Sequence, residues 1–309
     1  MSDMTLLKHL TALRLEVSIW SARRKLTAAD IAAPNLPPET LATLGTKKVC
    51  NPEDLRIFAA IRSRAIHLLD RQGVRFLGGW ALPDAAVTGI IADLEALAVE
   101  FAQAKEAFLA RYDEAVQAWI ASNPGWEALL TGASVRADIV RSRLDFAWQM
   151  FRLQSPRKGD AAKPLAEAVA KLGNTLYGEV ARVAEETWQK SLLGRSEVSL
   201  KALSPVRSVR QKLAGMSFVD PTVSPLLELI DAALSGLPEK GPLVGRDLVM
   251  LQGLVCLLRD PEAMQDHARQ VMDGGGLDTA LGKLLEIIPA APLPLETPAL
   301  PPVASLGLW

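Results

Sequence analysis

The stretch PDAAVTGIIADLEALAVEFAQAKEAFLARYDEAVQAWIASN, residues 83–123, decides the fold that the sequence predicts. Apolar residues return every seven positions along it, at Val87, Leu94, Phe101, Phe108 and Ala115. An apolar stripe with a period near 3.6 residues is typical of an amphipathic helix, here about ten turns long. Because such a helix cannot bury its stripe against itself, it needs a partner helix of similar length.

The expected partner is a second long helix at about residues 164–193. Its apolar residues recur at steps of three and four, at Leu165, Val169, Leu172, Leu176, Val180 and Val183. We therefore expect a mainly α, elongated protein built on an antiparallel, coiled-coil-like hairpin over residues 83–200. Short helices punctuated by proline and glycine should form a bundle over residues 201–288. Residues 289–309 are rich in proline and are expected to be a disordered tail.

Residues 1–82 are expected to form a mixed module with a small two-stranded β-ribbon. Leu13, Leu15, Val17 and Ile19 alternate with polar residues, which is the pattern of a half-buried strand. Residues 74–83 are the expected antiparallel partner, and Gly78 and Gly79 within them indicate a bulge or a close backbone approach. A two-stranded ribbon is marginal alone, so it should lie on helices. Residues 125–153 are predicted to form one or two helices.

Composition excludes several classes of protein. Hydrophobic residues make up 49% of the chain but aromatic residues only 5%, which favours helices packed through small and aliphatic side chains. The net charge of -1 gives no global attraction to nucleic acid or to anionic membrane. No run of about 18 apolar residues is present, so no transmembrane span is expected. Cys50 and Cys256 lie far apart in sequence, which fits free thiols in a reducing cytoplasm.

The motifs of catalysis and of metal binding are missing from the sequence. His9, His67 and His267 are the only histidines, and none has another histidine at a ligand spacing. No Gly-x-Ser-x-Gly elbow and no phosphate-binding Gly-x-x-x-x-Gly-Lys-Ser/Thr loop occurs. We therefore expect no catalytic residues, no metal, no cofactor and no enzymatic activity.

Charge is segregated along the chain. Residues 1–80 hold 12 Lys and Arg against 7 Asp and Glu, whereas residues 84–121 hold 2 against 7. Residues 136–158 hold 6 against 2. Two interpretations follow: basic segments pack on the acidic helix, or they form a surface for phosphate or for an acidic partner. We favour packing, because charge patterning usually concerns solubility and docking.

Four motifs carry a resemblance to a known family: IWSARRKL (19–26), LPPE (36–39), LGTKKVCNPE (44–53) and GVRFLGGWALP (73–83). Together they resemble an uncharacterised bacterial domain-of-unknown-function family carried on conjugative elements, plasmids and phages. The resemblance is strong over residues 13–84 and diffuse beyond them. It implies a mobile-element context, often with genes nearby for a MoxR-like AAA ATPase and a von Willebrand A-type protein. It implies no catalytic residue.

The candidate partner-binding residues fall into three groups. The expected ribbon would expose basic residues with an aromatic, whereas the competing interpretation is that Trp20 and Trp80 are core. The long helix would present an acidic rod, and the tail could anchor a partner through its last residue or dock on its own chain or a neighbouring subunit. The candidates are Arg23, Arg24, Lys25, Lys47, Lys48 and Trp80; Glu95, Glu100, Glu106, Asp113 and Glu114; and Trp309.

Two classes of function remain from the sequence. The first is a non-enzymatic adaptor or structural subunit working with the AAA ATPase, as a monomer or a homo-oligomer. The second is a nucleic-acid-binding accessory factor, which would use arginines beside Trp148 and Phe151 for phosphate contact and stacking. Its candidate residues are Arg136, Arg141, Arg143, Arg152, Arg157 and Lys158. Membrane insertion ranks last, because a hydrophobic hairpin of spanning length is missing.

Overall fold

The computed structural model of the chain describes residues 6–27, 30, 45–154, 163–274 and 276–286. The chain divides into two units. The first unit comprises the described residues up to Glu179 together with Ser208–Val223, and the second comprises Val180–Arg207 and the described residues from Ser224 onward. Helices α9 (Leu172–Thr187) and α10 (Leu203–Gly215) contribute residues to both units.

A four-stranded antiparallel sheet forms the framework of the first unit. Its strands lie in the order β4 (Val74–Phe76), β5 (Gly79–Pro83), β1 (Leu10–Ser18) and β6 (Asp145–Phe151). Strand β1 is long enough to pair with β5 at its start and with β6 along most of its length. Leu13, Leu15 and Val17 of β1 turn toward the core, while the residues between them are exposed.

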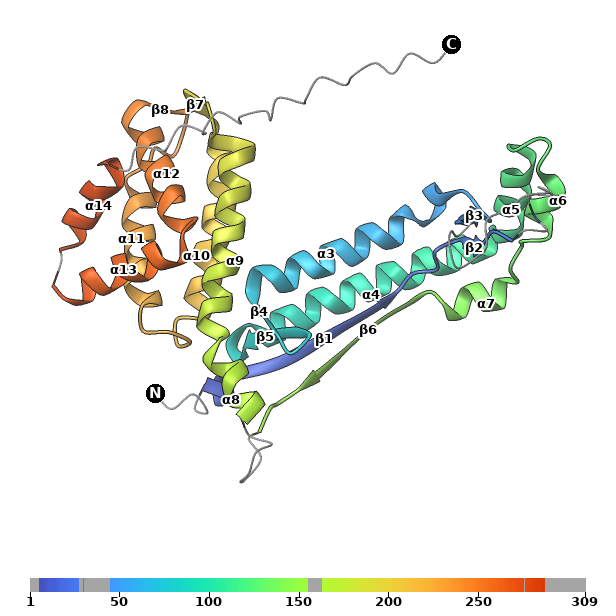
Figure 1. The fold of residues 1–309 in the computed structure, drawn as a ribbon, viewed down its shortest axis with the longest axis horizontal. Helices are drawn as coiled ribbons and strands as arrows, with labels where there is room; N and C mark the ends of the chain where they lie inside the picture. Colours follow the sequence, from blue (N-terminus) through green and yellow to red (C-terminus); the bar gives the residue numbers. More distant parts are fainter. Residues whose placement is uncertain (1–5, 28–29, 31–44, 155–162, 275, 287–309) are drawn as a thin grey trace, which may run out of the picture. The chain divides into compact units, whose positions relative to one another are not determined.

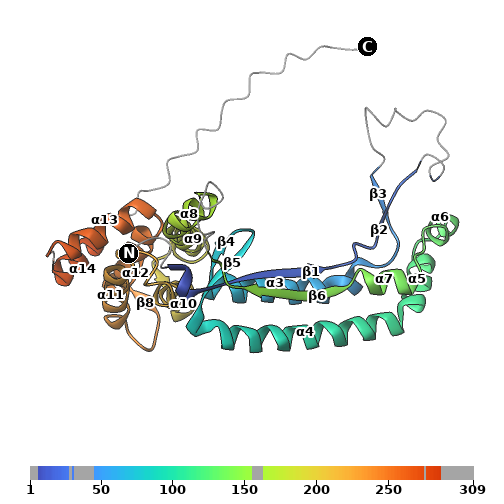
Figure 2. The ribbon, with the colours of Figure 1, turned by 90° about the horizontal axis from the view of Figure 1, so that it is seen from below.

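Two helices supply the other half of this core. Helices α3 (Arg56–Gln72) and α4 (Val87–Ala110) pack against each other and against the sheet, as Figures 1 and 2 show. Asn51 caps the short turn that leads into α3 by accepting a hydrogen bond from the Glu53 N–H, with proline next in the chain. The stripe of α4 is buried at Ile90, Leu94, Leu97, Phe101 and Phe108. These apolar residues drive the packing.

The region beyond α4 is tied back to that helix by hydrogen bonds. The helix is interrupted at Arg111 and continues as α5 (Tyr112–Ala121). The Tyr112 hydroxyl donates to the Val135 carbonyl at 2.7 Å, and the Lys105 ammonium donates to the Leu144 carbonyl at 2.6 Å. These bonds hold the segment with α6 (Glu127–Thr131) and α7 (Ala137–Ser142) beside α4 and α5.

The expectation of a mainly α protein with only a two-stranded ribbon is wrong. Residues 13–20 were expected to pair with residues 74–83, but β5 pairs with Leu10–Leu13 of β1, and Ala12–Ser18 pair with β6. Strands β4 and β6 bring the sheet to four antiparallel strands. Residues 145–151, predicted to be helical, form β6. Leu144, Trp148 and Phe151 fit a helical spacing, whereas Phe146, Trp148 and Met150 fit the alternation of a strand. Pairing with β1 decides between them.

The expected long-helix hairpin is also wrong. Helix α3 takes the place of the partner, because it packs along α4 while the sheet covers the rest of the apolar stripe. Residues 163–192 form α8 (Lys163–Ala170), α9 and a π-helical turn, η5 (Trp188–Leu192). The coiled coil was predicted because the apolar stripe of α4 must be buried. Helix α3 and the sheet together bury that stripe.

The second unit is a helical bundle centred on α12 (Gly245–Leu258). This helix packs on η5, on α13 (Pro261–Met272), on α14 (Leu277–Glu286) and on a small ribbon of β7 (Glu197–Val198) with β8 (Leu243–Val244). Helix α11 (Val223–Ser235) precedes β8 in the chain. Helices α10 to α14 lie within residues 201–288, where short helices were expected.

Within the described residues, no helix combines the length and the apolar character that a transmembrane span requires. The proline-rich tail over residues 289–309, with Trp309, lies outside the part of the chain that the structure describes.

Candidate functional site

A short basic ribbon in the first unit is the candidate site. Strand β2 (Arg23–Lys25) pairs antiparallel with β3 (Thr46–Lys48), with Arg23 opposite Lys48 and Arg24 opposite Lys47. Figure 2 shows the ribbon standing away from the sheet, at the end of the unit where α5 lies. Five of the sequence-predicted partner-binding residues therefore come together on the three residue pairs of this ladder.

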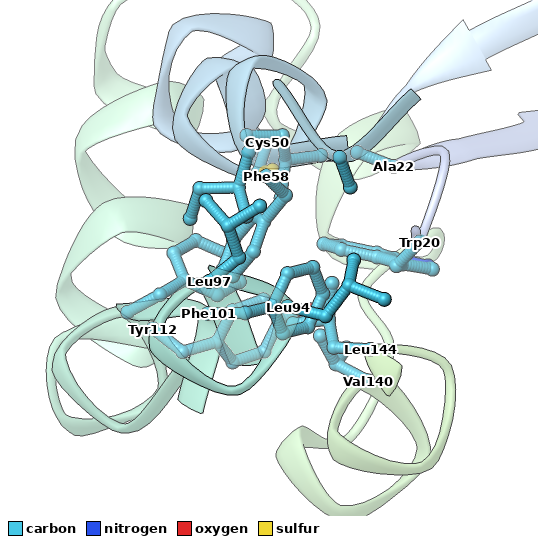
Figure 3. Packing of buried hydrophobic residues seen from close by; sticks show 14 of the residues in the cluster. Trp20, Ala22, Cys50, Phe58, Leu94, Leu97, Phe101, Tyr112, Val140 and Leu144 are labelled. Atoms are coloured by element: carbon cyan, nitrogen blue, oxygen red, sulfur yellow. The ribbon is translucent and has the colours of Figure 1, made fainter. Parts of the chain in front are cut away.

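Buried residues at its base anchor the ribbon. Trp20, Ala22, Val49 and Cys50 are all part of the hydrophobic core of the first unit. The Val49 N–H donates to the Ala22 carbonyl at 2.8 Å, which continues the ladder into the core. Figure 3 shows the Trp20, Ala22 and Cys50 side chains directed into the packed interior. The ribbon is therefore fixed at one end by packing.

Helix α5 adds two contacts at the same end. The Trp20 ring meets the Tyr112 ring edge-on at a centroid distance of 5.7 Å. The Trp119 indole N–H donates to the Lys48 carbonyl at 3.3 Å. Burial raises the pKa of the Cys50 thiol to about 12, so this thiol is protonated at neutral pH.

The cations are unevenly distributed over the two faces of the ribbon. Because side chains alternate along a strand, Arg23, Lys25 and Lys48 share one face, while Arg24 and Lys47 share the other. All except half-buried Lys47 are exposed. In the described part of the chain, no carboxylate lies within 4.0 Å of the charged groups of Arg23, Arg24 or Lys48. Arg23 and Lys48 therefore leave positive charge on the first face.

Asp30 neutralises one cation on the opposite face. Its carboxylate accepts from the Lys47 ammonium at 2.5 Å and from the Thr27 backbone N–H and hydroxyl at 2.7 and 2.8 Å. The Lys47 and Thr27 hydrogen bonds lower the pKa of Asp30 to about 2. Sequence reasoning missed Asp30, although Thr27-x-x-Asp30 has the spacing of a helix-capping pattern.

Trp80 does not lie on this ribbon. It sits on β5 with only 4% of its surface exposed, so the interpretation of Trp80 as core is the one the structure supports. Its indole N–H donates to Asp70 at 2.8 Å, and the Arg75 guanidinium stacks 4.0 Å from its ring centroid. Trp20 is buried as well. The exposed face of the ribbon is therefore basic without an aromatic from these residues.

The acidic residues of the predicted rod lie on α4 and α5. Glu100 accepts two hydrogen bonds from Arg64 of α3, both at 2.7 Å. Glu106 accepts two from Arg141 at 2.5 and 2.9 Å, and these bonds lower the pKa of Glu106. Glu95, Asp113 and Glu114 have no Lys or Arg within ion-pair distance in the described part of the chain. Two of the five acidic residues of the rod are therefore neutralised by arginines of the same unit.

The arginines proposed for nucleic acid are largely paired within the unit. Arg136 pairs with Asp138, Arg141 with Glu106, and Arg152 with Asp84, at 2.8, 2.5 and 2.9 Å. Arg143 ends α7 and has no carboxylate partner among the described residues, and Arg157 and Lys158 lie outside them. Trp148 packs against the core, while Phe151 is 42% exposed.

A buried ion pair that the sequence did not indicate lies elsewhere in the first unit. The Lys212 ammonium of α10 donates to the Glu179 carboxylate of α9 and to the Asp70 carbonyl at 2.7 Å. Glu179 also accepts from the Arg75 N–H at 2.9 Å. Lys212 is only 7% exposed. Lys212, Glu179 and Asp70 lie far apart in the sequence and form no motif, so the sequence alone does not indicate this ion pair.

No group of three or more His, Cys, Asp and Glu residues suited to a metal ion occurs among the described residues. The site in this molecule is instead a charged surface on a ribbon fixed to a mixed α and β unit.

Residues 7–260 match the family described as "Protein of unknown function (DUF3150)". The chain belongs to that family. No curated protein and no solved structure matches it.

Proposed function

We propose that this chain is a non-enzymatic interaction protein. In this proposal it is an adaptor or structural subunit of a mobile genetic element, works in the cytoplasm with a MoxR-like AAA ATPase, and docks through the basic ribbon. The mobile element and the ATPase come from the family resemblance. The docking surface comes from the arrangement of charge on β2 and β3.

The like-charged cross-strand pairs of the ribbon support this function best. Arg23 stands opposite Lys48, and Arg24 stands opposite Lys47. Like charges directly opposite each other destabilise a ladder. Lys47 is half-buried and paired with Asp30, but Arg23 and Lys48 are both exposed, so the ribbon keeps one uncompensated like-charged pair at its surface. The surface suits an acidic partner, since complementary charge sets docking orientation and partner choice.

An acidic protein surface fits better than nucleic acid. The chain carries a net charge of -1, and most described arginines of residues 136–152 are engaged with carboxylates. A domain that binds nucleic acid usually has a continuous basic patch and a basic pI. A nucleic-acid-binding accessory factor remains the second candidate, because the cations Arg23, Lys25 and Lys48 could also contact phosphates.

The test is the affinity of the purified chain for a MoxR-like AAA ATPase, the partner that the family resemblance implies. The variant R23E/K25E/K48E reverses the cationic face and should weaken binding at least about tenfold, as rim charges commonly govern such encounters. The matched variant E95K/D113K/E114K reverses three residues of the rod and should bind normally.

The outcomes separate the alternatives. Loss of binding only in the rod variant would move the docking surface to α4 and α5. Salt-dependent DNA binding that disappears in the ribbon variant, without ATPase binding, would favour the nucleic-acid candidate. If the purified chain neither binds the ATPase nor alters its turnover, the adaptor function is wrong.

A further inference from the structure

A surface hollow in the second unit gathers positive charge from three neighbouring segments. Its volume is about 320 Å³. Lys190 and Ser191 line it from the π turn η5, Arg195 and Glu197 from the segment that follows, and Ser199 and Lys201 from the start of the next helix. The π turn is an irregular feature that often marks functional positions in helices.

The backbone around the hollow is held in place. Trp188 of the π turn is buried, and the Leu193 N–H donates to its carbonyl at 2.9 Å. The Arg259 guanidinium lies 5.2 Å from the Trp188 ring centroid and binds Glu185 at 2.5 Å. On the other side, Glu197 and Val198 pair with β8. The positions of the lining residues are therefore set by packing and pairing.

Three cations face one carboxylate in this hollow. Lys190 pairs with Glu186 at 3.2 Å, outside the lining. In the described chain, neither Arg195 nor Lys201 has a carboxylate within 4.0 Å, and Glu197 has no cation within that distance. The unpaired charges of the lining are therefore two positive and one negative, and the excess positive charge around a concave surface raises the local concentration of anions.

Neutral donors complete the lining. The Ser199 side chain makes no capping hydrogen bond at the helix start, so its hydroxyl is available to a ligand. Ser191 offers a second hydroxyl. The hydroxyls, the guanidinium and the ammonium groups can all donate hydrogen bonds to the oxygen atoms of a phosphate.

We infer that this hollow binds a phosphoryl dianion, either inorganic phosphate or the phosphate of a small monoester. The lining supplies a net positive charge, and a divalent anion satisfies more of its donors at once than chloride does. Arg195 and Lys201 are the principal ligands, while the carboxylate of Glu197 repels the anion and weakens binding. The inference is independent of the basic ribbon, which lies in the other unit.

The test is isothermal titration of the full chain with inorganic phosphate at low ionic strength. Arg195→Ala and Lys201→Ala should each weaken binding about tenfold, the usual effect of losing a hydrogen bond to a charged group. Glu197→Gln should strengthen binding severalfold. Lys283→Ala on α14 removes the same charge from the same unit and should leave affinity unchanged. Circular dichroism checks that each variant is folded.

A second titration, with adenosine monophosphate, identifies the source of the phosphate. Tighter binding than inorganic phosphate indicates a monoester ligand, and equal binding indicates free phosphate; both support the site. Absence of wild-type binding at millimolar phosphate and at millimolar monophosphate would overturn the inference. An equal loss of affinity in Lys283→Ala and Lys201→Ala would overturn it as well, because binding would then follow total charge alone.

Discussion

Arg23 and Lys48 face each other across the β2–β3 ladder, on exposed positions with no carboxylate within 4.0 Å in the described chain. Only a few tenths of a kcal/mol separate a like-charged pair from a neutral one in a sheet. That small cost is tolerable because Trp20, Ala22, Val49 and Cys50 fix the base of the ribbon in the core. The charges can therefore serve binding without unfolding the ribbon.

Replacing one of these cations should stabilise the free protein. Lys48→Glu converts the like-charged pair into an opposite-charged pair and should raise the free energy of unfolding by about 0.5 kcal/mol. Lys48→Gln, which only removes the repulsion, should give a smaller gain. Urea denaturation of the three proteins measures the effect. A loss of stability in both variants would show that Lys48 has a structural role, contrary to the docking function.

The Asp30 carboxyl should titrate far below its usual range. Its pKa is lowered from 3.8 to about 2, chiefly by the hydrogen bond from Lys47. A depressed folded-state pKa contributes stability that is present above about pH 4 and is lost as the pH falls toward 2. Carbon-detected NMR should place the midpoint near 2 in the wild type and higher in Lys47→Ala. Identical midpoints in the two proteins would contradict the assigned contact.

Gly79 should tolerate no side chain, because β1 and β5 approach closely there. A Cβ on Gly79 would lie 2.2 Å from the Leu13 carbonyl oxygen. Gly79→Ala should therefore destabilise the protein by at least about 2 kcal/mol. Gly89→Ala is the matched control, since Gly89 lies in α4 with no atom within 4 Å of the added Cβ. It should stabilise the protein by up to about 1 kcal/mol, and thermal denaturation compares the two.

The same strand pair marks how far sequence patterns reach. Alternation over Leu13–Ile19 correctly predicts a half-buried strand, and the Gly78-Gly79 pair correctly indicates a close backbone approach. The expected partner was wrong for most of this strand, because residues beyond Leu13 pair with β6 and not with β5. The basic ribbon of β2 and β3 could not be predicted in the same way, because three-residue strands of charged residues have no hydrophobic period. Its pairing depends on Ala22 and Val49, whose burial is a property of the whole core.

For the long helix, the main error was the prediction of which element packs against it. The stripe from Val87 to Phe108 indicates what α4 must bury, but it is equally satisfied by a helix, by a sheet or by both. The structure covers it with α3 and the sheet. The candidate sites also depend on the tertiary structure. Lys190, Arg195 and Lys201 form no motif in the sequence, and they line one hollow only in the folded chain.

Breaking the buried pair of Lys212 and Glu179 should be costly. Lys212→Met leaves the Glu179 charge buried without its ammonium partner and should destabilise the first unit by about 3–5 kcal/mol. The double variant K212M/E179Q removes both charges while keeping an acceptor for the Arg75 N–H, so it should lose much less. Urea midpoints of the single and double variants decide. Equal losses would mean that the ion pair itself provides the stability.

Site-specific photo-crosslinking tests the docking function most directly. Thr46 lies on the cationic face, directly opposite Lys25, and carries no charge itself. Benzoylphenylalanine placed at Thr46 should crosslink to the MoxR-like ATPase, with a yield that falls as salt rises, whereas the same probe at exposed Ala96 on α4 should not. Crosslinking from Ala96 and none from Thr46 would contradict the proposal that the basic ribbon is the docking surface.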